Sequence, residues 1–305
     1  MPNHRKKKAG AATTQGSDPA VDGKEVQPAF FPYARYTSIV GVHTTLLAFS
    51  ALFVPRTNVL FELAKQLDWE EGQLTSRDKP QHPFLEPLTQ SPVATLTCIC
   101  LAVGLLQSWW ASWLRGWWID ITLEGTKGEK KARKLGITRV KLEEFSRAWT
   151  AVLICSFAFH FVFVLFGAPV LSKVLHTYSL ALTTSILIVL PPAYTFGPPS
   201  FGPDSAALVS RLTWVRLFAE TSVRSPIERA IVYPAIGALL GGWIGIIPTA
   251  LDWDRPWQAW PLTPAFGCIV GYITASIFAV AINGTAFLAE QVTLQTEAAS
   301  AAKSK

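Results

Sequence analysis

Long apolar runs alternate with polar connections along the chain. An α-helix needs about 20 apolar residues to cross the hydrocarbon core of a membrane. Six runs meet this requirement, and we expect each of them to form a membrane-spanning helix. No strands are expected, so the sequence predicts an all-α, polytopic integral membrane protein with six transmembrane helices. The predicted spans cover residues 36–54, 93–114, 148–171, 174–194, 230–251 and 262–286.

Polar segments make up the remainder of the chain. Residues 1–35 form a basic tail that lacks the apolar stretch of a cleavable signal peptide, and we expect this tail to be disordered. The membrane domain then runs over residues 36–289. It contains a flexible insertion at 55–92, with six acidic and four basic residues, and a basic loop at 115–147. Residues 290–305 form a second polar tail.

Positive charge is distributed unevenly between the connections. The two tails and the loops at 115–147 and 195–229 carry 21 of the 27 Lys and Arg residues. Because cytoplasmic segments are enriched in Lys and Arg, we expect both termini to be cytoplasmic, and the 55–92 insertion and the 252–261 loop to be lumenal. This topology explains the net charge of +6, so no nucleic-acid partner is expected. The Asn-x-Thr sequon at Asn283 lies at a cytoplasmic helix end and should carry no glycan.

The composition excludes several classes of protein. Charged residues make up 16% of the chain, against about 25% in an average globular protein. A soluble enzyme, a disordered chain and a secreted disulfide-rich protein are therefore excluded. All four cysteines lie inside apolar runs, where we expect small apolar side chains rather than metal or redox chemistry. These are Cys98, Cys100, Cys155 and Cys268, and no metal or cofactor is expected.

Polar chemistry inside the spans is scarce. A charged residue in a span would mark a functional site, but none of the predicted spans contains Asp, Glu, Lys or Arg. His43 and His160 remain as candidates, and a structural role is favoured for both. Two rival functions stay open: an intramembrane acyltransferase that uses one of these histidines, and a lipid transporter or scramblase. The residues that suggest a hydrophilic groove for transport are Thr44, Thr45, Thr183, Thr184 and Ser185.

The last two spans each carry small residues at four-residue spacing. In lipid, such a stripe lets two helix backbones approach closely. We favour the interpretation that the two stripes pack against each other, and the alternative is that one of them receives a helix of a partner protein. The stripes are Gly237, Gly241 and Gly245 in the fifth span and Gly267, Gly271 and Ala275 in the sixth.

The loop between these spans is the densest polar feature of the chain. Its carboxylates and arginine could pair with each other and cap the next helix, whereas a metal site is the weakest interpretation because only two carboxylates and no histidine are present. Trp and Arg on a short, proline-containing loop also make a good docking surface. We expect a lumenal docking loop formed by Asp252, Trp253, Asp254, Arg255, Pro256, Trp257, Gln258, Trp260 and Pro261.

The same loop, preceded by Gly-Gly-Trp-Ile-Gly, closely resembles the PIG-F family. A second similarity to that family is the run Phe166, Gly167, Ala168 and Pro169 at the end of the third span. A weaker one joins the segment Trp214-Val-Arg-Leu-Phe to the region of Glu228. The resemblance covers about residues 150–280.

The resemblance implies a function that the residues alone do not give. PIG-F proteins are polytopic proteins of the endoplasmic reticulum that act in glycosylphosphatidylinositol (GPI) anchor synthesis. They resemble stabilising, non-catalytic subunits of the GPI ethanolamine-phosphate transferases, which add ethanolamine phosphate to GPI mannoses. The expected partners are therefore these large membrane enzymes and the surrounding membrane lipids. The scarcity of catalytic residues and the lumenal position expected for the docking loop agree with this expectation.

Overall fold

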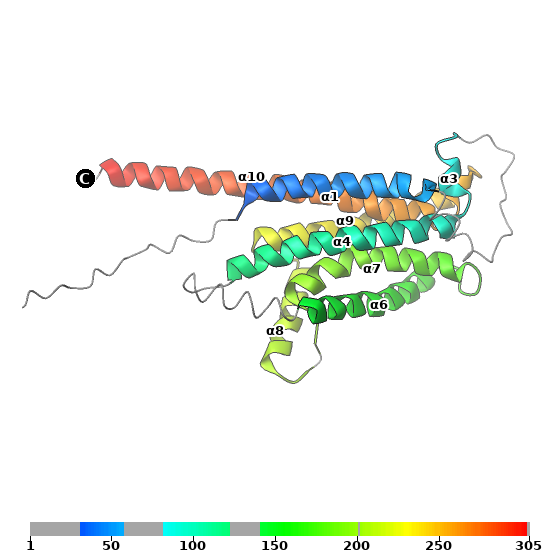
Figure 1. The fold of residues 1–305 in the computed structure, drawn as a ribbon, viewed down its shortest axis with the longest axis horizontal. Coiled ribbons are helices and arrows are strands. Elements are labelled where there is room, and N and C mark those ends of the chain that lie inside the picture. Colours follow the sequence, from blue (N-terminus) through cyan, green and yellow to red (C-terminus); the bar gives the residue numbers. More distant parts are fainter. Residues whose placement is uncertain (1–30, 58–81, 123–140, 201, 304–305) are drawn as a thin grey trace, which may run out of the picture. The chain divides into compact units, whose positions relative to one another are not determined.

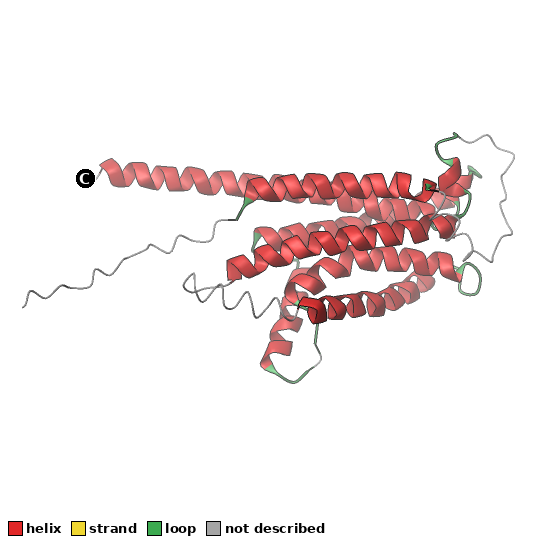
Figure 2. Cartoon of the chain, in the orientation of Figure 1, coloured by secondary structure: helices red, strands yellow, loops and turns green. Residues whose placement is uncertain are grey.

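A computed structural model describes residues 31–57, 82–122, 141–200 and 202–303 of the 305-residue chain. Within these ranges the secondary structure is helical and contains no strand, as Figure 2 shows. The N-terminal tail as far as residue 30, most of the 55–92 insertion and most of the 115–147 loop lie outside the described residues. The disorder and flexibility expected for those segments therefore stay predictions.

Long helices form the framework, and the prediction of six membrane-spanning helices is confirmed. Among the described residues, six helices are long and apolar enough to cross a membrane. Each is apolar on most of its faces and satisfies its backbone hydrogen bonds internally, as lipid requires. They are α1 (Tyr33–Phe53), α4 (Pro92–Thr122), α6 (Lys141–Leu165), α7 (Val174–Phe196), α9 (Pro226–Ile244) and α10 (Leu262–Lys303). The shorter elements are η1 (Val54–Arg56), α3 (Glu86–Thr89), α8 (Ser205–Trp214), the π-helical turn η2 (Val215–Ala219), η3 (Ile247–Ala250) and η4 (Pro256–Gln258).

The helix ends differ from the ends of the predicted spans. Helix α4 continues to Thr122 and α10 to Lys303, well past the apolar runs. Hydropathy marks where a helix leaves the membrane, whereas helical hydrogen bonding propagates into the polar sequence that follows. Helix α6 begins at Lys141 and ends at Leu165, so residues 166–171, which the third predicted span had included, lie in a turn that continues to residue 173.

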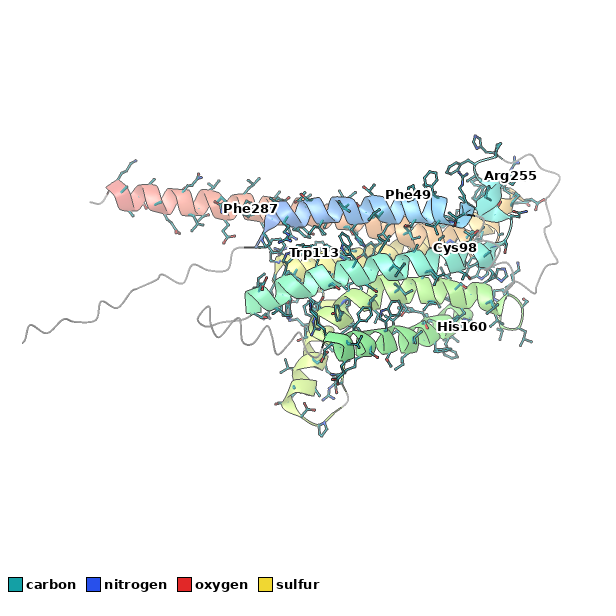
Figure 3. All side chains as sticks on the ribbon, in the orientation of Figure 1. Phe49, Cys98, Trp113, His160, Arg255 and Phe287 are labelled. Carbon is teal, nitrogen blue, oxygen red and sulfur yellow. The ribbon has the colours of Figure 1, made fainter. Side chains whose placement is uncertain are left out.

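The helices pack around α7. It contacts α4, α6, α9 and α10, and it is the most buried of the six helices, whereas α6 packs mainly against α7 and is the least buried. Helix α9 lies along α10, and α1 lies against α4 and α10 (Figure 1). The shared core includes Leu96 and Ile99 of α4, Leu187 of α7 and Ile269 of α10, all almost fully buried. Large apolar side chains on the outer faces, such as Phe49 in Figure 3, suit a lipid environment.

The up-and-down order of the helices gives two ends with different character. One end, which we call the loop end, gathers η1, α3, the turn at 166–173 and the η3–η4 connection (Figure 1). The other, the arginine end, holds the starts of α1, α6 and α9, the ends of α4 and α7, and α8. Its described cations are Arg35, Arg115, Lys141, Arg147, Arg211, Arg216, Arg224 and Arg229, against Arg56, Lys173 and Arg255 at the loop end. Helix α10 extends past the other helices beyond the arginine end (Figure 1).

Candidate functional site

One amide side chain fastens the base of the docking loop. Gln258 Nε2 donates to the carbonyl oxygens of Pro248 at 2.6 Å and Leu251 at 2.8 Å, and Gln258 Oε1 accepts from the Arg255 backbone N–H at 2.7 Å. A single side chain thus joins the η3 segment that follows α9 to the turn before α10. Trp260 adds a tie to α7, because its indole N–H donates to Thr177 Oγ1 at 3.0 Å.

The tip of the same loop is exposed. Asp252, Trp253, Asp254 and Arg255 are all exposed, and the side chain of Trp253 is 53% exposed while its ring lies 5.7 Å from that of Trp257. Asp254 adopts a left-handed backbone conformation at φ 49°, which Asp tolerates better than most residues. Figure 3 shows Arg255 at the outer edge of the loop end. The structure therefore divides the predicted docking loop into an exposed tip and a tied base that includes Gln258, Trp260 and the buried Pro261.

The small residues of α9 and α10 face each other. A methyl group placed on Gly241 would strike the carbonyl oxygen of Gly267 and lie 2.9 Å from the Gly271 Cα, and one on Gly271 would lie 2.9 Å from the Gly241 Cα. At the ends of the contact, Gly245 meets Thr263, and Gly237 meets Ala275. We call these residues the glycine seam: Gly237, Gly241, Gly245, Gly267, Gly271 and Ala275. Within this chain the seam joins α9 to α10.

The Phe166, Gly167, Ala168 and Pro169 run ends helix α6. The Gly167 N–H donates to the carbonyl of Val164 and the Ala168 N–H to that of Phe163, both at 3.0 Å, which is the Schellman pattern of a helix C-terminus. Gly167 has a φ of +101°, which an L side chain rarely adopts, and Pro169 prevents the helix from continuing. Phe166 is largely exposed beside this cap.

A buried ion pair was missed by the sequence analysis. Arg216 of η2 and Glu228 in the first turn of α9 meet at 2.6 Å, and Glu228 is only 3% exposed. The carboxylate also accepts from the backbone N–H groups of Arg224 at 2.6 Å and Ser225 at 3.2 Å, while Arg216 donates to the Ser222 carbonyl at 2.6 Å. The hydrogen bond to the Glu228 carboxylate raises the pKa of Arg216 above its usual value.

Two sequence signals pointed to this pair. The pattern Ser225-Pro-Ile-Glu228 is a capping box, and the structure shows both of its reciprocal hydrogen bonds. The weaker of the family similarities also joined the Arg216 segment to the Glu228 region. What the sequence could not show is that the connection folds back so that the two side chains meet.

The predicted sequon is buried at the arginine end. Asn283 of α10 is 2% exposed, accepts from Arg229 Nε at 2.6 Å and donates to the Pro226 carbonyl at 3.0 Å. These bonds tie α10 to the first turn of α9, so Asn283 has a structural role in this fold.

The residues behind the two rival functions make contacts within the chain, and most of them are buried. His43 is 1% exposed and its ring stacks on that of Trp110 at 5.1 Å, and the half-buried His160 lies on α6, 6.1 Å from the ring of Tyr178 (Figure 3). The hydroxyl groups that suggested a hydrophilic groove form hydrogen bonds within the chain instead. Thr44 and Thr183 donate to carbonyls of their own helices, Thr45 does so on an exposed face, Thr184 contacts Cys268 Sγ, and Ser185 donates to the Val152 carbonyl.

Metal chemistry has no support in the described ranges. Among these residues there is no group of three or more His, Cys, Asp or Glu side chains that could hold a metal ion. The four cysteines are free, and those on α4 and α10 are buried.

Comparison with known proteins identifies the family. A family model described as "GPI biosynthesis protein family Pig-F" matches residues 81–280. The chain belongs to the PIG-F family. The human GPI ethanolamine phosphate transferase, stabilizing subunit, is 30% identical over 60% of this chain and 74% of its own length. The glycosylphosphatidylinositol anchor biosynthesis protein 11 of Pyricularia oryzae is 34% identical over 62% of this chain and 67% of its own length, and that of Yarrowia lipolytica is 34% identical over 56% and 68%.

The PIG-F match includes four of the sites described above, whereas Asn283 and His43 lie outside the matched residues. It contains the docking loop, the glycine seam, the α6 cap and the Arg216–Glu228 pair. No solved structure matches the chain. The resemblance inferred from the sequence motifs is thus confirmed at the level of the family.

Proposed function

We propose that this chain is the non-catalytic, stabilising subunit of a GPI ethanolamine phosphate transferase in the membrane of the endoplasmic reticulum. The observation that carries the proposal is the similarity to a human protein that is named as the stabilizing subunit of that enzyme. The membrane-spanning fold suits a subunit that lies beside such an enzyme in a membrane. The catalytic subunit of the transferase is the proposed partner.

The charge distribution supports an orientation in which the loop end faces the lumen. The described arginines and lysines gather mainly at the arginine end, which the positive-inside rule assigns to the cytoplasm. Both termini are then cytoplasmic, and the docking loop lies on the lumenal side. A lumenal loop can reach the part of a partner enzyme that lies outside the membrane.

The exposed tip of the docking loop is the proposed contact with the catalytic subunit. Trp253 and Arg255 belong to the residue types that dominate interface energetics, and both are exposed on a loop whose base is fixed by Gln258. A fixed base lowers the entropy that the loop loses when a partner binds. The tip is thus suited to recognition, and the base to presenting the tip in one conformation.

Replacement of Arg255 tests the proposal. In cells that lack the endogenous protein, the Arg255→Ala variant should be present in normal amounts. It should give less ethanolamine phosphate on GPI than the wild type does, as measured by mass spectrometry of GPI intermediates. Arg147→Ala removes an exposed arginine at the opposite end and should restore both. A normal ethanolamine phosphate content with Arg255→Ala would reject the role of the loop tip. A normal ethanolamine phosphate content of GPI in cells that lack this chain altogether would reject the proposed function.

A further inference from the structure

Helix α8 is held against the chain on one face, and its other face is apolar and exposed. The inner face is fastened to the segment that follows α7. Trp214 Nε1 donates to the Gly197 carbonyl at 2.9 Å, Ser210 Oγ to the Pro198 carbonyl at 3.2 Å, and Arg211 to the Ser200 carbonyl at 2.9 Å. Ala207 is buried on the same face. These bonds fix the rotation of α8 about its own axis.

The outer face presents four large apolar side chains. Leu208, Val209, Leu212 and Val215 are 49%, 63%, 57% and 49% exposed. Their spacing of i, i+1, i+4 and i+7 places them on one side of the helix. Exposure of such a face to water is unfavourable. Contiguous apolar surface of this kind therefore marks an interaction site.

The position of α8 in the fold identifies what covers this face. The helix lies in the connection between α7 and α9, so both of its ends are tied to helices that cross the membrane. It is therefore held at the arginine end, where these helices leave the membrane (Figure 1). The exposed Arg224 in the same connection can meet lipid phosphates at this end.

The composition of the face favours lipid over a protein helix. Helices that pack against each other in membranes approach through small residues, as the glycine seam does in this chain. The outer face of α8 instead carries Leu and Val, with no Gly, Ala or Ser between Leu208 and Val215 on that side. Branched apolar side chains on one face of a short helix are typical of helices that lie in the membrane interface.

We propose that α8 lies in the plane of the membrane interface at the arginine end, with Leu208, Val209, Leu212 and Val215 inserted among the lipid acyl chains. The helix then anchors the connection between α7 and α9 to the bilayer surface and supports the Arg216–Glu228 pair that follows it. This inference rests on the membrane-spanning fold and is independent of the proposed function.

Spin labels on the full-length protein test the insertion. Leu212→Cys carries a nitroxide on the outer face, and Ala206→Cys carries one at an exposed position two residues before Leu208, which points to the other side of the helix. Each labelled protein is reconstituted into vesicles of phosphatidylcholine and phosphatidylserine. Wild-type protein treated in the same way corrects for labelling of the half-buried Cys155.

Collision rates with two reagents then report the surroundings of each label. Oxygen concentrates among acyl chains, and a water-soluble nickel chelate stays outside the membrane. The ratio of oxygen to nickel collisions should be several-fold higher at Leu212 than at Ala206. Equally low ratios of oxygen to nickel collisions at the two positions would show that the outer face lies in water. Weak collisions with both reagents at Leu212 would show that protein covers this face. Either result overturns the proposal, and Val209→Cys repeats the test if Leu212→Cys does not fold.

Discussion

Single residues set the ends of the helices in this protein. Gly167 is the clearest case, because its positive φ lets α6 end in a Schellman motif and turn toward α7. A methyl group at this position would meet no neighbouring atom within 4 Å, so the backbone conformation alone explains the glycine.

Replacement of Gly167 should measure that conformational requirement. We expect Gly167→Ala to lower the free energy of unfolding by about 1 kcal/mol, because an L side chain is strained at this φ. Gly167→Asn should cost less, since Asn tolerates the left-handed region better. Thermal unfolding in detergent, followed by circular dichroism, compares the two variants. Equal losses in both would show that the left-handed conformation is not the cause.

Glu228 is a second residue on which a local structure depends. Glu228→Gln keeps the shape of the side chain but leaves the Arg216 guanidinium without its charged partner, so we expect a loss of about 3 kcal/mol in unfolding free energy. Glu144→Gln removes an exposed pair with Arg147, 3.4 Å apart, and should cost less than about 1 kcal/mol. Denaturant unfolding of both purified variants in detergent gives the two values. Similar small losses would contradict a stabilising role for the buried pair.

At the scale of elements, the α9–α10 pair depends on close contact between the two helix backbones. Its small residues bring backbone atoms together without intervening side chains, so any larger residue must separate the helices. The base of the docking loop lies at one end of this pair and the Asn283 bonds at the other. The packing of the two helices therefore controls how the docking loop is presented.

Gly241→Leu should disrupt the pair and, with it, the complex. Insertion of a large side chain at the backbone contact should cost about 3 kcal/mol and lower the amounts of both this chain and the transferase complex. Gly41→Leu is the matched control, since a methyl group at Gly41 of α1 would meet no atom within 4 Å. Blue-native gels and immunoblots measure the two amounts. Unchanged complex with a normal amount of the Gly241→Leu protein would reject this role of the seam.

The elements also show how far the sequence could predict the fold. The six spans follow from hydropathy alone, because a span must be apolar over a fixed length, and the stripes of the glycine seam follow from their four-residue spacing. The extension of α10 could not be found in this way, since hydropathy ends at the membrane and the helix does not. The sequence also could not predict which residues of the docking loop are exposed and which are held by hydrogen bonds. Gln258 bonds to carbonyl groups whose positions depend on the path of the folded chain.

At the scale of the whole membrane domain, the two ends carry different chemistry. The arginine end holds the buried Arg216–Glu228 pair, the Arg229–Asn283 bond and the amphipathic α8. The loop end presents an exposed Trp, an Arg and two carboxylates. We infer that the arginine end serves mainly to hold the helices together and the loop end to contact the transferase. The PIG-F motifs occur at both ends, which suits a subunit whose fold and docking surface are both required.

The central claim is that this chain is an accessory subunit of a larger transferase. Affinity purification of the full-length, tagged protein in a mild detergent, followed by quantitative mass spectrometry, tests it most directly. We predict recovery of a large polytopic GPI ethanolamine phosphate transferase in about equal amounts with this chain. Recovery of the folded chain without any such transferase would contradict the account.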